Sequence, residues 1–187
     1  MAAPFVMLPA LLAMLLWQGA PPPPAAVPPP VEQSSTDCER PTYASDHLVC
    51  GNADLRRLDG ELVALLATGP TPAGPWIEPQ ADWFRRSRTC AFLTNHAACL
   101  NAAYRERIGL LRAASRPPPA DLTCRPSRLK AALQPEGLLI RDGANLVGIA
   151  ARATSGWQPF LELRAGKRDD RVHDRQGRLV ARCVRPE

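Results

Sequence analysis

Six cysteines constrain the fold of this 187-residue chain more than any other feature. An even number of cysteines is typical of proteins that fold in an oxidising compartment, where cysteines pair as disulfides. The six stand at Cys38, Cys50, Cys90, Cys99, Cys124 and Cys183. Among the many pairings that six cysteines allow, the pairing of sequence neighbours closes the smallest loops. It predicts the bonds Cys38–Cys50, Cys90–Cys99 and Cys124–Cys183.

The spacing of the cysteines also argues against a metal site. Zinc ligands usually include pairs about two to four residues apart, and no two cysteines of this chain are spaced in that way. The histidines, His47, His96 and His173, stand near no such pair. We therefore expect neither a metal nor a cofactor.

An apolar stretch over residues 5–17 has the length of a signal peptide and is too short to cross a bilayer. Small residues at positions 19–26 offer cleavage sites, and the prolines around them would end a longer helix. We expect a signal peptide over 1–26 and a proline-rich linker over 27–37. The mature protein would then be periplasmic or secreted, with no transmembrane helix after cleavage.

Basic residues are concentrated near the C-terminus. Positions 31–120 contain ten basic and ten acidic residues, whereas positions 121–187 contain thirteen basic and eight acidic residues. A basic surface attracts nucleic acid, anionic lipid or acidic glycan, and an exported protein meets mainly the last two. We expect no nucleic-acid partner. A solvated face that aids solubility explains the same charge equally well.

Residues 38–114 have the pattern of a helical domain. A first helix, capped at Asn52 or Asp54, carries leucines on one face, and a second helix carries Trp83. A third helix places Tyr104 among apolar residues at helical spacing. These segments predict a disulfide-stapled module of three helices.

The chain changes character after a proline-rich linker at 115–120. Within residues 121–187, four short apolar runs separated by turn residues are typical of strands. The runs lie at 138–140, 146–149, 160–163 and 179–181. A bond between Cys124 and Cys183 would tie the first strand to the last. We therefore expect an α+β protein in which the helical module precedes a small antiparallel β-sheet or barrel.

A combination of cysteine spacing, helix periodicity and aromatic residues over 38–112 carries a family resemblance. Eleven residues separate the first two cysteines, and the third cysteine follows Trp83 by seven positions. The residues that carry the resemblance are Cys38, Cys50, Leu55, Leu58, Asp59, Leu62, Trp83, Phe84, Cys90, Cys99, Leu100, Tyr104, Arg107, Ile108 and Leu111. This segment resembles the LprI-like lysozyme inhibitor domain. It departs from that family at Ser87, where an arginine is usual; Arg86 and Arg88 flank the position.

The C-terminal segment contains Ser155-Gly156 and Gly166-Lys167, with cysteines near both of its ends. In these features it is similar to the MliC-like small barrels, a second family of lysozyme inhibitors. In that family a serine and a lysine on loops reach into the lysozyme active-site cleft. The resemblance therefore implies Ser155 and Lys167 as the candidates for contact with the inhibited enzyme.

Residues 169–174 form the one sequence cluster that combines acids with a histidine, which could serve acid–base catalysis or cation binding. Arg168, Arg171 and Arg175 would neutralise these acids, and a polar turn before the last strand explains the composition. The sequence contains no nucleophile elbow, phosphate loop or HExxH motif. We therefore predict no catalytic residues and a protein that is not an enzyme.

Two functions remain as hypotheses. The resemblances imply an exported bacterial protein that binds and blocks lysozyme without chemistry of its own. The basic C-terminal segment instead suits an envelope module that binds acidic glycan, peptidoglycan or phospholipid head groups.

Overall fold

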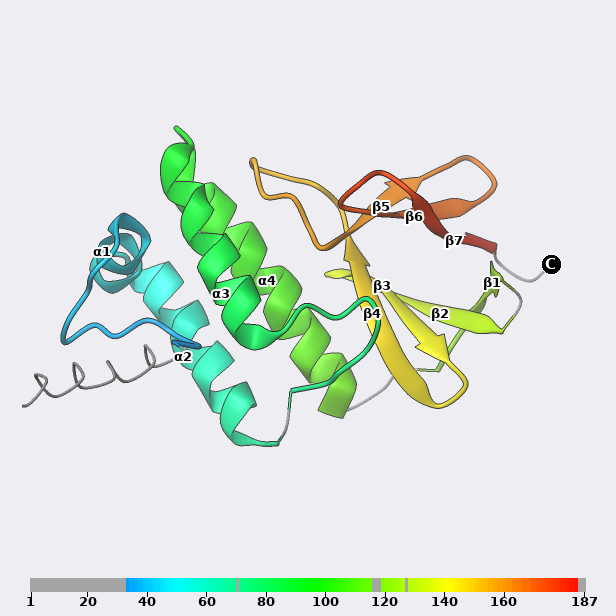
Figure 1. Cartoon of the computed structure of the whole chain (residues 1–187), viewed down its shortest axis with the longest axis horizontal. Coiled ribbons are helices and arrows are strands. Elements are labelled where there is room, and N and C mark those ends of the chain that lie inside the picture. Colours follow the sequence, from blue (N-terminus) through cyan, green and yellow to red (C-terminus); the bar gives the residue numbers. More distant parts are fainter. Residues whose placement is uncertain (1–32, 70, 116–118, 127, 185–187) are drawn as a thin grey trace, which may run out of the picture. The chain divides into compact units, whose positions relative to one another are not determined.

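The computed structural model describes residues 33–69, 71–115, 119–126 and 128–184 (Figure 1). All of them belong to one compact unit, Glu32–Glu187. The predicted signal peptide, most of the first proline-rich linker and part of the second lie outside the described residues. Within the described ranges, no helix combines the length and the apolar character needed to span a membrane.

Helices make up the first half of the described chain. Their bounds are Ala44–Gly51 for α1, Ala53–Ala67 for α2, Gln80–Ser87 for α3, Arg88–Phe92 for the 3-10 helix η1, and His96–Ser115 for α4. The three predicted helices correspond to α2, α3 and α4, and α1 is an additional helix. Its eight residues lack a regular apolar spacing, and buried polar residues, Ser45 and Asp46, fix it instead.

The core of the helical part contains the leucines and aromatic residues that the sequence placed on helix faces. Asn52 caps α2, since its side chain accepts a hydrogen bond from the backbone N–H of Leu55 at 3.0 Å. Leu55 packs in one buried cluster with Trp83, Tyr104 and Leu62. The rings of Trp83 and Tyr104 meet edge to face, with centroids 5.4 Å apart.

Seven strands form a closed barrel in chain order (Figure 1). Their bounds are Leu122–Arg125 for β1, Leu129–Gln134 for β2, Gly137–Asp142 for β3, Asn145–Ala151 for β4, Leu161–Ala165 for β5, Asp170–Asp174 for β6 and Leu179–Val184 for β7. The predicted strands at 138–140, 146–149 and 179–181 lie within β3, β4 and β7, and the one at 160–163 begins one residue before β5. The expectation of an entirely antiparallel arrangement is wrong in one place, because β4 and β5 pair in parallel.

The charged run 169–174 is mostly strand rather than the polar turn that we predicted. It contains β6, in which Val172 is fully buried in the barrel while Arg171 is exposed. Charge dominates the outward positions of this strand, so its composition resembled a turn. One buried valine is a weak signal of a strand.

The three predicted disulfides are confirmed. Cys38–Cys50 ties the start of the described chain to α1, and Cys90–Cys99 joins η1 to α4. Cys124 and Cys183 are directly opposite each other on β1 and β7, so their bond covalently links the first and last strands of the closed barrel.

Helix α4 packs directly on the barrel. Leu110 belongs to a buried cluster with Leu139 and Ile149, which lie on β3 and β4. Gly109 permits a close approach, because a Cβ at this position would lie 2.7 Å from the Cβ of Glu136 in the β2–β3 connection. The absence of a side chain at Gly109 therefore helps α4 to sit against this edge of the barrel.

Candidate functional site

A short disulfide-closed loop carries the most exposed large hydrophobic side chain among the residues that the structure describes. The Cys90–Cys99 bond closes this loop, and α4 begins inside it at His96. Phe92 is 88% exposed and Leu93 is 38% exposed. Single exposed apolar residues are common on protein surfaces, but an aromatic ring held out from a crosslinked loop is a natural anchor for a partner.

The Ser155 turn lies against this loop. Thr154 and Trp157 pair as an isolated antiparallel β-bridge. The two turn residues between them, Ser155 and Gly156, have φ angles of 53° and 79°. Two left-handed residues are typical of the tightest hairpin turns. A Cβ on Gly156 would lie 2.6 Å from the Cδ1 atom of Leu93, so the turn and the loop are in close contact.

Trp157 anchors the turn. Its side chain is buried in the helical core cluster although it comes from the β4–β5 connection. The indole N–H donates a hydrogen bond to the carboxylate of Glu106 on α4. On the other side, the guanidinium of Arg86 lies 4.0 Å from the ring centroid, and its Nη1 donates to the carbonyl of Gln158 at 2.6 Å. The exposed Ser155 is therefore held by a buried neighbour.

Glu106 is a buried carboxylate at the junction between α4 and the barrel. Burial raises its pKa to about 7, while the hydrogen bond from Trp157 and the charge of Arg86 act in the opposite direction. The backbone N–H of Phe160 also approaches this carboxylate, at 3.4 Å. Glu106 therefore holds two points of the β4–β5 connection, and its charge is sensitive to pH near neutrality.

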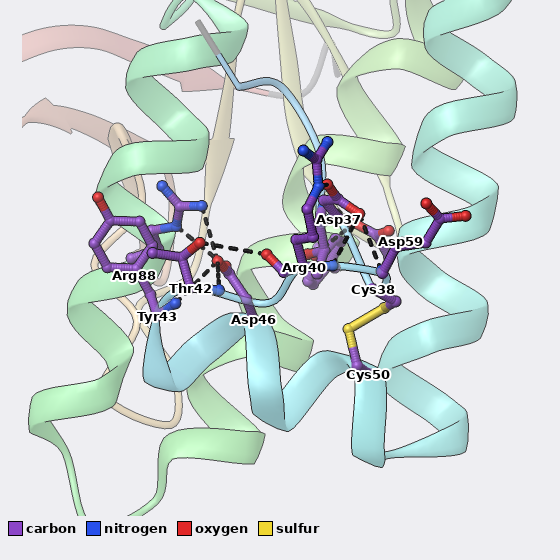
Figure 2. Close-up of a disulfide and its surroundings, with 12 residues drawn as sticks. Asp37, Cys38, Arg40, Thr42, Tyr43, Asp46, Cys50, Asp59 and Arg88 are labelled. Atoms are coloured by element: carbon purple, nitrogen blue, oxygen red, sulfur yellow. Dashed lines mark hydrogen bonds and ion pairs between the residues drawn. A yellow bond between two sulfur atoms is a disulfide. The ribbon is translucent and has the colours of Figure 1, made fainter. Parts of the chain in front are cut away.

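Arg86 and Arg88 take separate roles on either side of Ser87. Arg86 forms a two-pronged ion pair with the buried carboxylate of Glu78, with contacts between 2.5 and 3.0 Å. Arg88 contacts both carboxylate oxygens of Asp46, at 3.2 and 3.0 Å. Figure 2 shows this second pair between η1 and α1, near the Cys38–Cys50 disulfide. The departure from the LprI-like pattern at Ser87 thus leaves both neighbouring arginines tied to buried acids.

Asp46 and the ring of Tyr43 complete the surroundings of Arg88. Asp46 also accepts hydrogen bonds from the backbone N–H groups of Thr42 and Tyr43, which fixes the start of α1. The Arg88 guanidinium lies 4.0 Å from the centre of the Tyr43 ring (Figure 2). These contacts orient α1 and η1 and thereby support the loop that carries Phe92.

Two grooves flank the Ser155 turn. One, of about 450 Å³, is lined by Ser155, Asn101 and Arg105 together with residues of α2 and α4. The other, of about 390 Å³, is lined by Arg105, Arg152 and Trp157 together with the β2–β3 connection. Arg105 and Arg152 are exposed, so positive charge borders the turn.

The second predicted contact residue, Lys167, lies elsewhere on the barrel. It is exposed in the connection between β5 and β6, two residues beyond the end of β5. Ser155 precedes β5 and Lys167 follows it, so the strand separates the two residues in the chain. No hydrogen bond joins them in the described structure. The Phe92 loop, rather than Lys167, is the neighbour of Ser155.

No group of three or more His, Cys, Asp or Glu residues that could hold a metal ion occurs within the ranges that the structure describes. In the charged run, Asp169 pairs with Arg171 and Arg182, and Asp174 pairs with Arg178. These acids therefore serve as counter-charges to arginines.

Comparison with protein-family models, with curated proteins and with solved structures finds no match to this chain.

Two features of the site were missed in the sequence. Phe92 could have been found as the aromatic residue inside the short Cys90–Cys99 loop, where a small loop has little interior in which to bury a ring. Glu106 gave no signal, because on a helical pattern it falls between Tyr104 and Ile108 as an ordinary polar position. Its burial depends on Trp157, a residue 51 positions later in the chain.

Proposed function

We propose that this protein is a non-catalytic inhibitor that inserts the Phe92 loop and the Ser155 turn into the cleft of a lysozyme. The observation that carries the proposal is the contact between these two segments: Leu93, next to the 88% exposed Phe92, lies against Gly156, next to the serine that the MliC-like resemblance marks. A location in the periplasm or outside the cell, expected from the apolar stretch over residues 5–17 and the six cysteines, suits three disulfides, which persist in oxidising compartments.

Rigidity supports this role. Binding loses affinity when loops must be ordered, and a loop that is already fixed avoids that loss. The Phe92 loop is closed by Cys90–Cys99, and the Ser155 turn is fixed by the buried Trp157. Both segments therefore present their exposed side chains in a defined arrangement before any partner arrives.

Local charge also supports a lysozyme as the partner. Many lysozymes are basic, so a protein with a net charge of +5 gains no long-range attraction to them. Glycoside hydrolases nevertheless carry a pair of carboxyl groups in the cleft. Arg105 and Arg152 are exposed and line a groove beside the Ser155 turn, so we expect them to meet that acidic pair if the turn enters the cleft.

The test is a lysis assay with the mature protein and a panel of lysozymes from different classes. We expect wild type to slow at least one of them at micromolar concentration. Phe92→Ala should weaken the inhibition about 30-fold, since loss of a central aromatic anchor typically costs about 2 kcal/mol of binding free energy. Ser155→Gly retains the left-handed turn, removes the hydroxyl group and should also weaken inhibition.

Leu179→Ala is the matched control, because Leu179 is another exposed apolar residue (54%) but lies on β7. This variant should inhibit as well as wild type. An absence of inhibition across the panel would refute the proposed function. Inhibition that Phe92→Ala leaves unchanged would refute the role of the loop.

A further inference from the structure

Four arginines occupy neighbouring positions on four successive strands of the closed barrel. Arg164 on β5 is directly opposite Arg171 on β6, which is opposite Arg182 on β7. Arg182 is in turn opposite Arg125 on β1. All four are exposed, so they form a continuous row across the outside of the barrel. We call these four residues the arginine row.

This arrangement opposes sheet stability. Neighbouring strands are about 4.8 Å apart, and like charges directly opposite each other on a sheet are destabilising. Two carboxylates offset part of the repulsion: Glu162 contacts Arg164 at 2.7 Å, and Asp169 contacts Arg171 and Arg182 at 3.3 and 3.0 Å. Arg125 has no carboxylate partner within the described ranges. The row therefore retains positive charge that an external anion could neutralise.

The curvature of the barrel favours a flexible chain over a flat surface as the source of that anion. The row covers three of the seven steps between neighbouring strands, or roughly 150° of the circumference. A flat bilayer could meet only part of such a row at one time. An extended polymer can bend around the barrel and reach every arginine.

The guanidinium groups of the row indicate which kind of polymer suits it. Guanidinium groups bind carboxylates with two parallel hydrogen bonds. Neighbouring strands are about 4.8 Å apart at the backbone, and side chains that point outward from a closed barrel diverge, so the guanidinium groups are spaced more widely than the strands. A polysaccharide with a carboxylate on every sugar offers acceptors along its whole length and can adjust to that wider spacing. Lys167 and Arg168, exposed in the connection after β5, add positive charge beyond Arg164.

We propose that the arginine row is a binding site for an acidic polysaccharide with one carboxylate per sugar. The site is separate from the Phe92 loop and does not depend on lysozyme inhibition. Occupation of the row by sugar carboxylates would relieve the repulsion that Glu162 and Asp169 leave between the arginines.

The experiment measures the binding of fluorescently labelled polygalacturonate to the intact protein by anisotropy at physiological salt. The test variant is Arg125→Gln with Arg164→Gln, which removes both ends of the row and leaves the Asp169 contacts in place. The control is Arg56→Gln with Arg57→Gln, which removes the same charge from exposed positions on α2.

We expect wild type to bind, the test variant to bind about tenfold more weakly, and the control to remain within about twofold of wild type. Equal losses in the two variants would show general charge attraction and overturn the site. No binding by wild type would also overturn it. Tighter binding to inorganic polyphosphate or to anionic phospholipid vesicles than to polygalacturonate would overturn the assignment to an acidic polysaccharide.

Discussion

Replacing Glu106 by Gln should stabilise the protein relative to wild type, and this gain in the free energy of unfolding should grow as the pH rises. In the folded protein burial raises the pKa of Glu106 to about 7, from an ordinary value of 4.5. The glutamine variant keeps an oxygen that can accept the hydrogen bond from Trp157, but it never carries a buried charge. The substitution therefore separates the effect of charge from the effect of the hydrogen bond.

The direction of this pH dependence follows from the difference between the pKa of Glu106 in the folded protein and its pKa in the unfolded chain. A carboxyl group with a raised folded-state pKa is more readily protonated in the folded protein than in the unfolded chain. Its stabilising contribution is complete below pH 4.5 and is lost as the pH rises through about 7. For this difference in pKa, the loss is on the order of 3 kcal/mol in the free energy of unfolding.

The assay is urea unfolding followed by tryptophan fluorescence, with disulfides intact, at pH values from 4.5 to 8. The variant should gain up to about 3 kcal/mol relative to wild type across this range, with most of the gain between pH 5 and 7.5. Glu39→Gln removes the same charge from an exposed position and is the matched control. A stability difference that is constant with pH, or that narrows as the pH rises, would refute the reasoning.

Two further substitutions test how the site is held together. Gly156→Ala places a Cβ 2.6 Å from the Cδ1 atom of Leu93 at a φ of 79°. The free energy of unfolding, measured by thermal unfolding, should therefore fall by about 1–2 kcal/mol. Unchanged stability would contradict the close contact. The double change Cys90→Ser with Cys99→Ser opens the short loop and should reduce the free energy of unfolding by about 2.5 kcal/mol. It should also increase backbone amide exchange around Phe92, and exchange equal to wild type would show that the crosslink does not order the loop.

Local patterns in the sequence were sufficient for much of the fold. The leucine spacing of α2 and the Asn52 cap depend only on nearby residues, so they could be read directly. The disulfides could be predicted from loop length, because Cys38–Cys50 and Cys90–Cys99 each join cysteines that are close in sequence. The remaining pair is then Cys124–Cys183. The four apolar strands were visible because consecutive buried residues, as in Leu138–Ile140, leave a continuous run.

Features that depend on distant partners could not be predicted in the same way. Helix α1 is stabilised by the ion pair between Asp46 and Arg88, which are 42 positions apart. The parallel pairing of β4 and β5 requires the 152–160 connection to return the chain so that β5 runs in the same direction as β4, and no short motif encodes that path. The alignment of Arg171 with Arg182 is likewise a property of strand register, since the sequence shows only scattered basic residues.

The same distinction applies to the candidate site. Ser155 was identified by resemblance alone, and its left-handed turn against Leu93 became visible only in three dimensions. Lys167, identified by the same resemblance, lies beyond the opposite end of β5. A two-residue motif specifies neither the path of the chain between its members nor their separation in space.

The most direct test of the central claim is calorimetric titration of the mature protein into a lysozyme, with and without an oligosaccharide that fills the enzyme's cleft. If the Phe92 loop and the Ser155 turn enter the cleft, the protein binds the free lysozyme, and saturating oligosaccharide abolishes the binding. Binding that persists undiminished in the filled enzyme would place the contact outside the cleft and contradict the claim, as would the absence of binding to every lysozyme in the panel.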